Sequence, residues 1–110
     1  MNYKSLLKPN SAPTEIPALG QKVFVRRLSS TELDDYLKAI DRETDNDKLN
    51  VLGIELFLGA LVNEDGSKPK KTDLPTVAEL LAVHAPGDLK EAVMDVQRNS
   101  YGTLETARKN

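Results

Sequence analysis

The chain has 110 residues, of which 39% are hydrophobic and 29% charged, with a formal net charge of −2. This length fits one domain, and the composition is that of a globular rather than a disordered protein. The absence of cysteine excludes disulfides, thiolate nucleophiles and zinc–thiolate sites. No concentrated basic face is visible, so nucleic-acid binding is not expected. The apolar run from Leu49 to Val62 is too short to span a bilayer, so we expect a soluble protein without membrane contact.

Three prolines divide the N-terminal part of the chain. Pro9, Pro13 and Pro17 each remove a backbone donor and restrict the preceding residue. Residues 1–13 are therefore predicted to form an extended lead, with at most one turn of helix around Tyr3 to Leu7.

A short hairpin is predicted next. Val23 and Val25 alternate with polar neighbours, which is typical of a half-buried strand, and Gly20 belongs to a turn before it. The preceding residues "TEIP" are predicted to pair back with this strand. A two-stranded ribbon is only marginally stable alone, so it must pack on the rest of the domain.

Helix starts are marked by a reciprocal capping pattern, in which two side chains three residues apart bond each other's free backbone N–H groups. The pattern occurs at Ser29 with Glu32, at Thr76 with Glu79 and at Asp88 with Glu91. We predict one helix from each of these points, with the last two helices joined at Pro86-Gly87.

Another helix is predicted from about Lys48 to Val62, and its apolar side chains form two stripes at about 100° per residue. The broad stripe contains Val51, Ile54, Phe57, Leu58, Leu61 and Val62. The narrow stripe contains Leu49, Leu52, Leu56 and Ala60. Two alternatives stay open: both stripes are covered inside the monomer, or the narrow stripe meets another chain.

Together these elements predict a mainly α fold, a small helical domain of about four helices with a short N-terminal β-hairpin. The single domain is expected to span residues 14–100. A flexible or frayed tail is expected at residues 101–110.

Catalytic, metal and cofactor sites are not expected. His84 is the only histidine, and neither cysteine nor suitably spaced carboxylates accompany it. A calcium loop starting at Asp45 fails, because Asn50 and Leu56 stand where glycine and glutamate are needed. The sequence therefore predicts a protein that is not an enzyme and whose function depends on its surfaces.

Several stretches occur in an order known from one protein family. They are "EIPALGQKVFVRRLSSTELDDYL", an apolar helix ending in "LGALVNEDGSKP", then "LPTVAELL", "LKEAVMDVQRNSYG" and a terminal "ETARKN". Over residues 14–110 the chain resembles the tail assembly chaperones of long-tailed (siphovirus-type) bacteriophages. The family often has an apolar pair soon after the "VNEDG" turn, whereas "SKPKK" follows it here.

The resemblance implies a role in virion morphogenesis without catalysis. Proteins of this family bind the long, largely helical tape measure protein, keep it soluble and promote tail tube assembly around it. They are expected to form homo-oligomers in the cytoplasm of the infected bacterial host and to be absent from the mature virion. The candidate surface for client binding or self-association is the narrow stripe, Leu49, Leu52, Leu56 and Ala60.

Two alternative functions belong to other classes. One is a small structural head–tail connector or other virion morphogenesis protein, which mass spectrometry would find in purified particles. The other is a regulatory adaptor with a bacterial partner, whose gene would lie away from tail genes.

The resemblance also concerns the end of the chain. In the family, some ribosomes slip near the end of the short form and make a longer form, through which the tail tube protein is contacted. Arg108, Lys109 and Asn110 can be encoded by a message containing A AAA AAC, a sequence on which such slippage occurs. A plain basic tail is the alternative, and the nucleotide sequence decides between the two.

Overall fold

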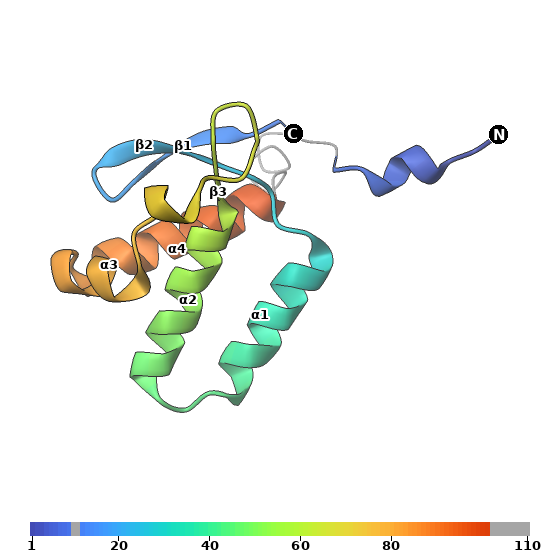
Figure 1. The fold of residues 1–110 in the computed structure, drawn as a ribbon. Coiled ribbons are helices and arrows are strands. Elements are labelled where there is room, and N and C mark those ends of the chain that lie inside the picture. Colours follow the sequence, from blue (N-terminus) through green and yellow to red (C-terminus); the bar gives the residue numbers. More distant parts are fainter. Residues whose placement is uncertain (10–11, 102–110) are drawn as a thin grey trace, which may run out of the picture.

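The computed structural model describes residues 1–9 and 12–101 (Figure 1). The elements in chain order are η1 (Lys4–Leu7), β1 (Thr14–Ala18), β2 (Gln21–Val25), α1 (Ser30–Arg42), α2 (Asn46–Ala60), β3 (Leu61–Val62), η2 (Lys71–Asp73), α3 (Val77–Val83) and α4 (Pro86–Tyr101). The elements labelled η are short 3-10 helices. Within the described residues the fold is mainly α with an N-terminal hairpin, which confirms the predicted fold class.

The predicted hairpin is present, with Thr14 opposite Val25 and Ala18 opposite Gln21. Its two-residue turn consists of Leu19 and Gly20, which have φ angles of +53° and +85°. Such turns follow the twist of the strands, but a leucine in this region is strained. The Leu19 side chain packs against the hydrophobic core, and this packing holds the turn in place.

The second long helix differs from its prediction at both ends. It begins at Asn46, because the Asp45 side chain accepts a hydrogen bond from the backbone N–H of Asp47 (2.8 Å) and caps it there. It ends at Ala60, and Leu61 and Val62 form strand β3 instead of a last helical turn. These two residues pair antiparallel with β2, so the backbone bonds of a third strand replace those of the helix.

The last helix begins earlier than the capping pattern predicts. The N–H groups of Asp88 and Leu89 both donate to the carbonyl oxygen of Ala85, which places Pro86 at the first helical position. Proline favours this position because its φ is already helical and its missing N–H would have no partner there. Asp88 is thus a first-turn residue and not the cap. The capping pairs before α1 and α3 are present as predicted.

The core lies between the sheet, α2 and α4, and α2 also packs on α1 and α3. Its buried residues are Ala18, Val25, Leu28, Leu33, Phe57, Ala60, Ala92, Val93 and Val96. A smaller cluster joins α2, α3 and α4 through Ile54, Leu80 and Leu89. Among the described residues, α2 is therefore the helix that the others surround (Figure 1).

Arg26 and Glu32 connect three parts of the domain. The guanidinium donates two hydrogen bonds to the Glu32 carboxylate (2.8 and 2.6 Å) and one to the carbonyl oxygen of Gly59 (3.2 Å). Glu32 also accepts from the backbone N–H of Ser29 (2.9 Å). The end of β2, the start of α1 and the end of α2 are thereby held together.

The loop after β3 is held by its own hydrogen bonds. Asp65 accepts from the N–H and the hydroxyl of Ser67, and the N–H of Asn63 donates to the carbonyl oxygen of Ser67 (2.9 Å). Gly66 has a φ of +90°, and a Cβ there would lie 3.3 Å from Cγ of Pro13. The tip of this loop therefore packs against the residue that precedes β1.

Two predicted segments lie at the ends of the chain. The predicted helical turn near Tyr3 is η1, and none of the residues in η1 is buried. The predicted tail begins at Tyr101, which is the last residue of α4, and residues 102–110 lie outside the described part of the chain.

The ion pair between Arg26 and Glu32 makes the free energy of unfolding depend on pH. The hydrogen bonds from Arg26, above all, lower the pKa of Glu32 from 4.5 to about 2. A carboxylate with a lowered folded-state pKa stabilises the protein above its unfolded pKa, and this contribution is lost as the pH falls from about 4.5 to 2. Because both side chains are more than a third exposed, we expect Glu32→Gln to lower the free energy of unfolding by only about 1 kcal/mol at pH 7. Urea denaturation should show the difference from wild type shrinking below pH 4.5.

Glu79→Gln is the matched control, because Glu79 occupies the same capping position in α3 and forms no salt bridge with a described residue. Glutamine is tolerated at this position in both helices. Equal effects of the two substitutions on the free energy of unfolding at every pH would show that the Arg26 pair contributes nothing specific.

Two glycines of α2 allow a second test. A Cβ at Gly59 would meet nothing within 4 Å, whereas one at Gly53 would lie 3.3 Å from Val93 Cγ2. We expect Gly59→Ala to raise the free energy of unfolding by about 0.5–1 kcal/mol, since alanine favours the helix. For Gly53→Ala the gain in the free energy of unfolding should be smaller by at least about 0.5 kcal/mol, because Val93 must move to make room for the added methyl group. Thermal and urea unfolding would measure both, and equal gains would mean that α2 and α4 are not in close contact at Gly53.

Candidate binding groove

A groove with a mainly apolar lining runs between α1, α2 and α4, with the end of α3 at its rim. Its volume is about 550 Å³, within the range of about 300–1,000 Å³ that is usual for ligand pockets. The lining residues are Tyr36, Ile40, Asn46, Leu49, Asn50, Gly53, Ile54, Leu81, His84, Pro86, Leu89, Lys90 and Val93.

Gly53 lies on the groove wall where α2 packs most closely on its neighbours. Helix α2 passes so close to its neighbours here that a Cβ would lie 3.3 Å from Val93 Cγ2 and 3.5 Å from the Tyr36 hydroxyl oxygen. Burial raises the pKa of Tyr36, so its hydroxyl stays protonated and can donate a hydrogen bond. The groove thus combines apolar walls with a polar donor close to Gly53.

Leucines from two helices line the groove. Leu49 of α2 is half-buried, and Leu81 of α3 keeps 43% of its surface exposed although it lines the groove. Val83, two residues further along α3, is 76% exposed and does not line the groove. Leu49 and Leu81 therefore offer apolar surface that an occupant of the groove would cover.

Charged groups lie around the groove. Lys90 is on the α4 wall, and His84 is the C-terminal cap residue of α3. Two other lining residues, Ile40 and Asn46, lie next to the turn between α1 and α2. This turn and the adjoining helix ends, which we call the acidic turn, carry Asp41, Glu43, Asp45 and Asp47 against Arg42 and Lys48.

The structure separates the members of the predicted narrow stripe. Leu49 lines the groove and Leu52 is half-buried. Leu56 is half-buried and packs against the main core, and Ala60 has no exposed surface at all. Ala60 is thus a core residue of the monomer and cannot contact another chain directly, since the sheet and α4 cover the end of α2. The stripe is not one continuous surface.

The broad stripe packs largely inside the monomer. Ile54 and Phe57 are buried, and Leu58 packs against both clusters. Sequence reasoning missed the α3 and α4 side of the groove, because Leu81 and Leu89 come from distant helices. The one feature of the sequence that pointed to this region was Gly53, because a glycine lies there between the two apolar stripes of the helix.

In the ranges 1–9 and 12–101, no group of three or more histidine and acidic side chains is placed to hold a metal ion. The same residues contain no helix that is long and apolar enough to cross a membrane.

Comparison with known proteins identifies the family. The model of a family described as phage tail assembly chaperone protein, TAC, matches residues 2–110. No curated protein and no solved structure matches the chain. Because the family model covers nearly the whole sequence, the chain belongs to the phage tail assembly chaperone family.

Proposed function

We propose that this protein is a non-enzymatic chaperone that binds the tape measure protein, keeps it soluble in the host cytoplasm and promotes tail tube assembly around it. Family membership supports the role in tail assembly. The observation that carries the binding mode is the open apolar groove of about 550 Å³. A helical client can lay its apolar face into such a groove, as many amphipathic helices do.

Each part of the groove has a role in this proposal. Leu49 and Leu81 are the apolar anchors, because both line the groove and neither is fully buried. The Tyr36 hydroxyl donates a hydrogen bond to a polar group of the client. Gly53 lets α1 and α4 pack closely on α2 at the groove, since a Cβ there would meet Val93 and Tyr36.

The other stripe residues contribute differently. Leu56 and Ala60 support the fold, because one packs against the core and the other is part of it. Leu52 stays a candidate for self-association, since it is half-buried and is not a lining residue of the groove. Homo-oligomer formation and absence from the mature virion are part of the same proposal.

Leu81→Asp tests the client site. A carboxylate in an apolar groove is poorly solvated, so we expect it to weaken tape measure binding at least about tenfold, or about 1.4 kcal/mol. Co-expression of both proteins, followed by affinity purification and quantification of soluble tape measure protein, measures this. Val83→Asp is the matched control on the same helix and should bind as wild type does.

The comparison is valid if circular dichroism shows that both variants are folded. Equal recovery of tape measure protein with both variants would exclude the groove as the client site. A wild-type protein that fails to recover tape measure protein would refute the proposed function itself.

A longer form made by ribosomal slippage is the second part of the proposal, and it would connect the chaperone to the tail tube protein. If the message contains A AAA AAC at its end, an antibody against the chaperone should detect a larger product as well. Changing the codon of Lys109 from AAA to AAG keeps the amino acid and should abolish the larger product. Persistence of that product would show that slippage at this site is not its source.

A further inference from the structure

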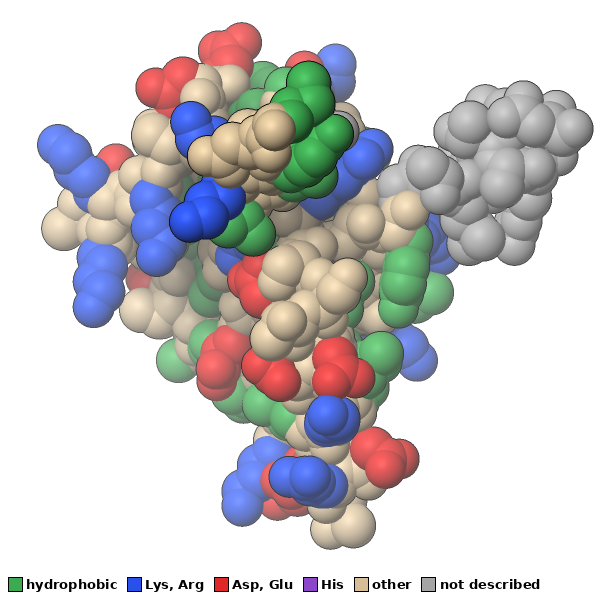
Figure 2. Space-filling model, turned by 90° about the vertical axis from the view of Figure 1, so that its right-hand side faces the viewer, with side chains coloured by type: hydrophobic (Ala, Val, Ile, Leu, Met, Phe, Trp, Pro, Cys, Tyr) green, Lys and Arg blue, Asp and Glu red, His purple; other side chains and the backbone are tan. Residues whose placement is uncertain are grey.

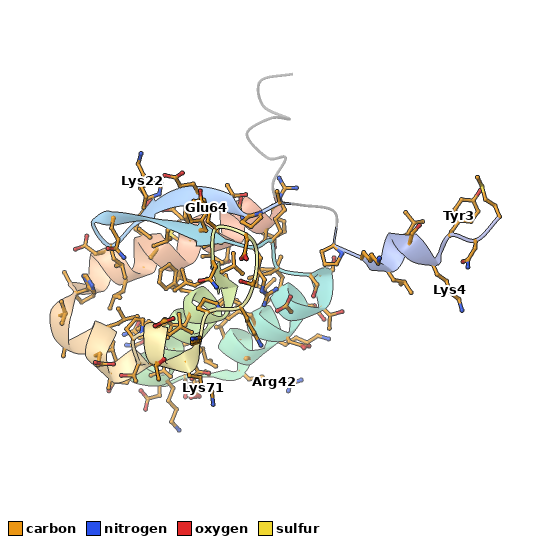
Figure 3. All side chains as sticks on the ribbon, turned by 45° about the horizontal axis from the view of Figure 1, so that its top comes forward. Tyr3, Lys4, Lys22, Arg42, Glu64 and Lys71 are labelled. Atoms are coloured by element: carbon orange, nitrogen blue, oxygen red, sulfur yellow. The ribbon has the colours of Figure 1, made fainter. Side chains whose placement is uncertain are left out.

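Residues 1–9 form an N-terminal arm in which every residue is exposed. Three of its large apolar side chains, Tyr3, Leu6 and Leu7, are 65%, 78% and 83% exposed. Figures 1 and 3 show the arm extending away from the body of the domain, with Tyr3 and Lys4 far from the helices. Figure 2 faces this side of the molecule and shows uncovered hydrophobic side chains there. An apolar face on a segment without a core of its own marks a contact site.

The groove on the same protein has complementary properties. It is open, mainly apolar and about 550 Å³ in volume, so it can accept the side chains of a single helical turn. Leu81 and Leu49 provide apolar surface on α3 and α2. Each copy of the chain therefore carries both an uncovered apolar turn and an uncovered apolar groove.

The charges of the two surfaces are also complementary. The arm contains Lys4 and Lys8 and no acidic residue. The acidic turn adjoins the groove next to Ile40 and Asn46, while Lys90 is on the α4 wall. An arm that enters the groove is thus favoured with its lysines toward the acidic turn and away from Lys90.

We propose that the N-terminal arm of one copy docks into the groove of a second copy, with Tyr3, Leu6 and Leu7 packed against Leu49 and Leu81. The arm leaves the domain at the β1 end, whereas the acidic turn lies at the opposite end (Figure 1). The arm is therefore directed away from the groove of its own chain and toward another copy.

This contact is head-to-tail, because arm and groove are different surfaces. Repetition of such a contact gives a ring if it closes and an open chain if it does not. The arm occupies the same groove that we propose as the binding site for the tape measure protein. Only the following step of the inference rests on that proposed function. Tape measure binding and self-association through the arm then compete for one site.

Sedimentation velocity of the purified protein without any client tests the contact. Leu6→Asp with Leu7→Asp, and separately Leu81→Asp, should each raise the dissociation constant of self-association at least tenfold. Ser5→Asn, on the same exposed turn and without a change of charge, and Val83→Asp, on the same helix as Leu81, are the matched controls and should associate as wild type does. Added salt should weaken association of the wild type, because lysines face the acidic turn.

Mixing the two defective variants tests the head-to-tail geometry. The arm variant keeps an intact groove and the Leu81→Asp variant keeps an intact arm, so the mixture should form a heterodimer that cannot grow further. The chain has no cysteine, so Leu6→Cys and Leu81→Cys variants can be mixed and oxidised without background disulfides. A disulfide-linked dimer is expected, and replacing Leu81→Cys by Val83→Cys should reduce its yield.

Three results would overturn the inference. These are wild-type association by the arm variant, absence of a heterodimer in the mixture, and a disulfide formed within one monomer when both cysteines are in the same chain. The proposed function fails separately. If the arm contact is found but no tape measure protein is recovered, the proposed client is wrong. If tape measure protein is recovered but the arm contact is not found, only the arm contact is wrong.

Discussion

Glu32 lies where β2 ends and α1 begins, and its carboxylate accepts hydrogen bonds from Arg26, which also donates to the end of α2 at Gly59. Tyr36 and Ile40 follow one and two turns later on the same face of α1. The position of Glu32 therefore sets the direction in which this face points toward α2. The ion pair thus adds to the packing of α1 on α2 in orienting one wall of the groove, although neither Arg26 nor Glu32 lines the groove.

The two apolar stripes of α2 suggest that one of them is exposed along the whole helix, but the structure shows a different arrangement. The sheet, α3 and α4 cover most of its large side chains, including Ile54 and Phe57. What stays open is the groove between α1, α2 and α4, which is lined by side chains of all three helices. A concave apolar surface suits a helical segment as partner better than a flat stripe would, because it can cover the partner on several sides.

Local signals predicted local structure well. The capping pairs at Ser29 and Thr76 predicted two helix starts, because both partners lie within one turn of each other. The prediction failed at Val62, where pairing with a distant strand overrides the helical pattern, and at Asp88, where Pro86 offers an earlier start. The groove could not be predicted, because its walls come from helices that only tertiary packing brings together.

The contact between Gly66 and Pro13 joins two regions that are far apart in sequence. The loop that carries Gly66 is stiffened by the hydrogen bonds of Asp65 and Ser67, so it acts as a buttress for the chain just ahead of the hairpin. A surface loop therefore helps to hold Pro13, the residue just before β1, in place. Lengthening or shortening this loop would shift Pro13, and with it the point at which the chain enters β1, while leaving the helical core intact.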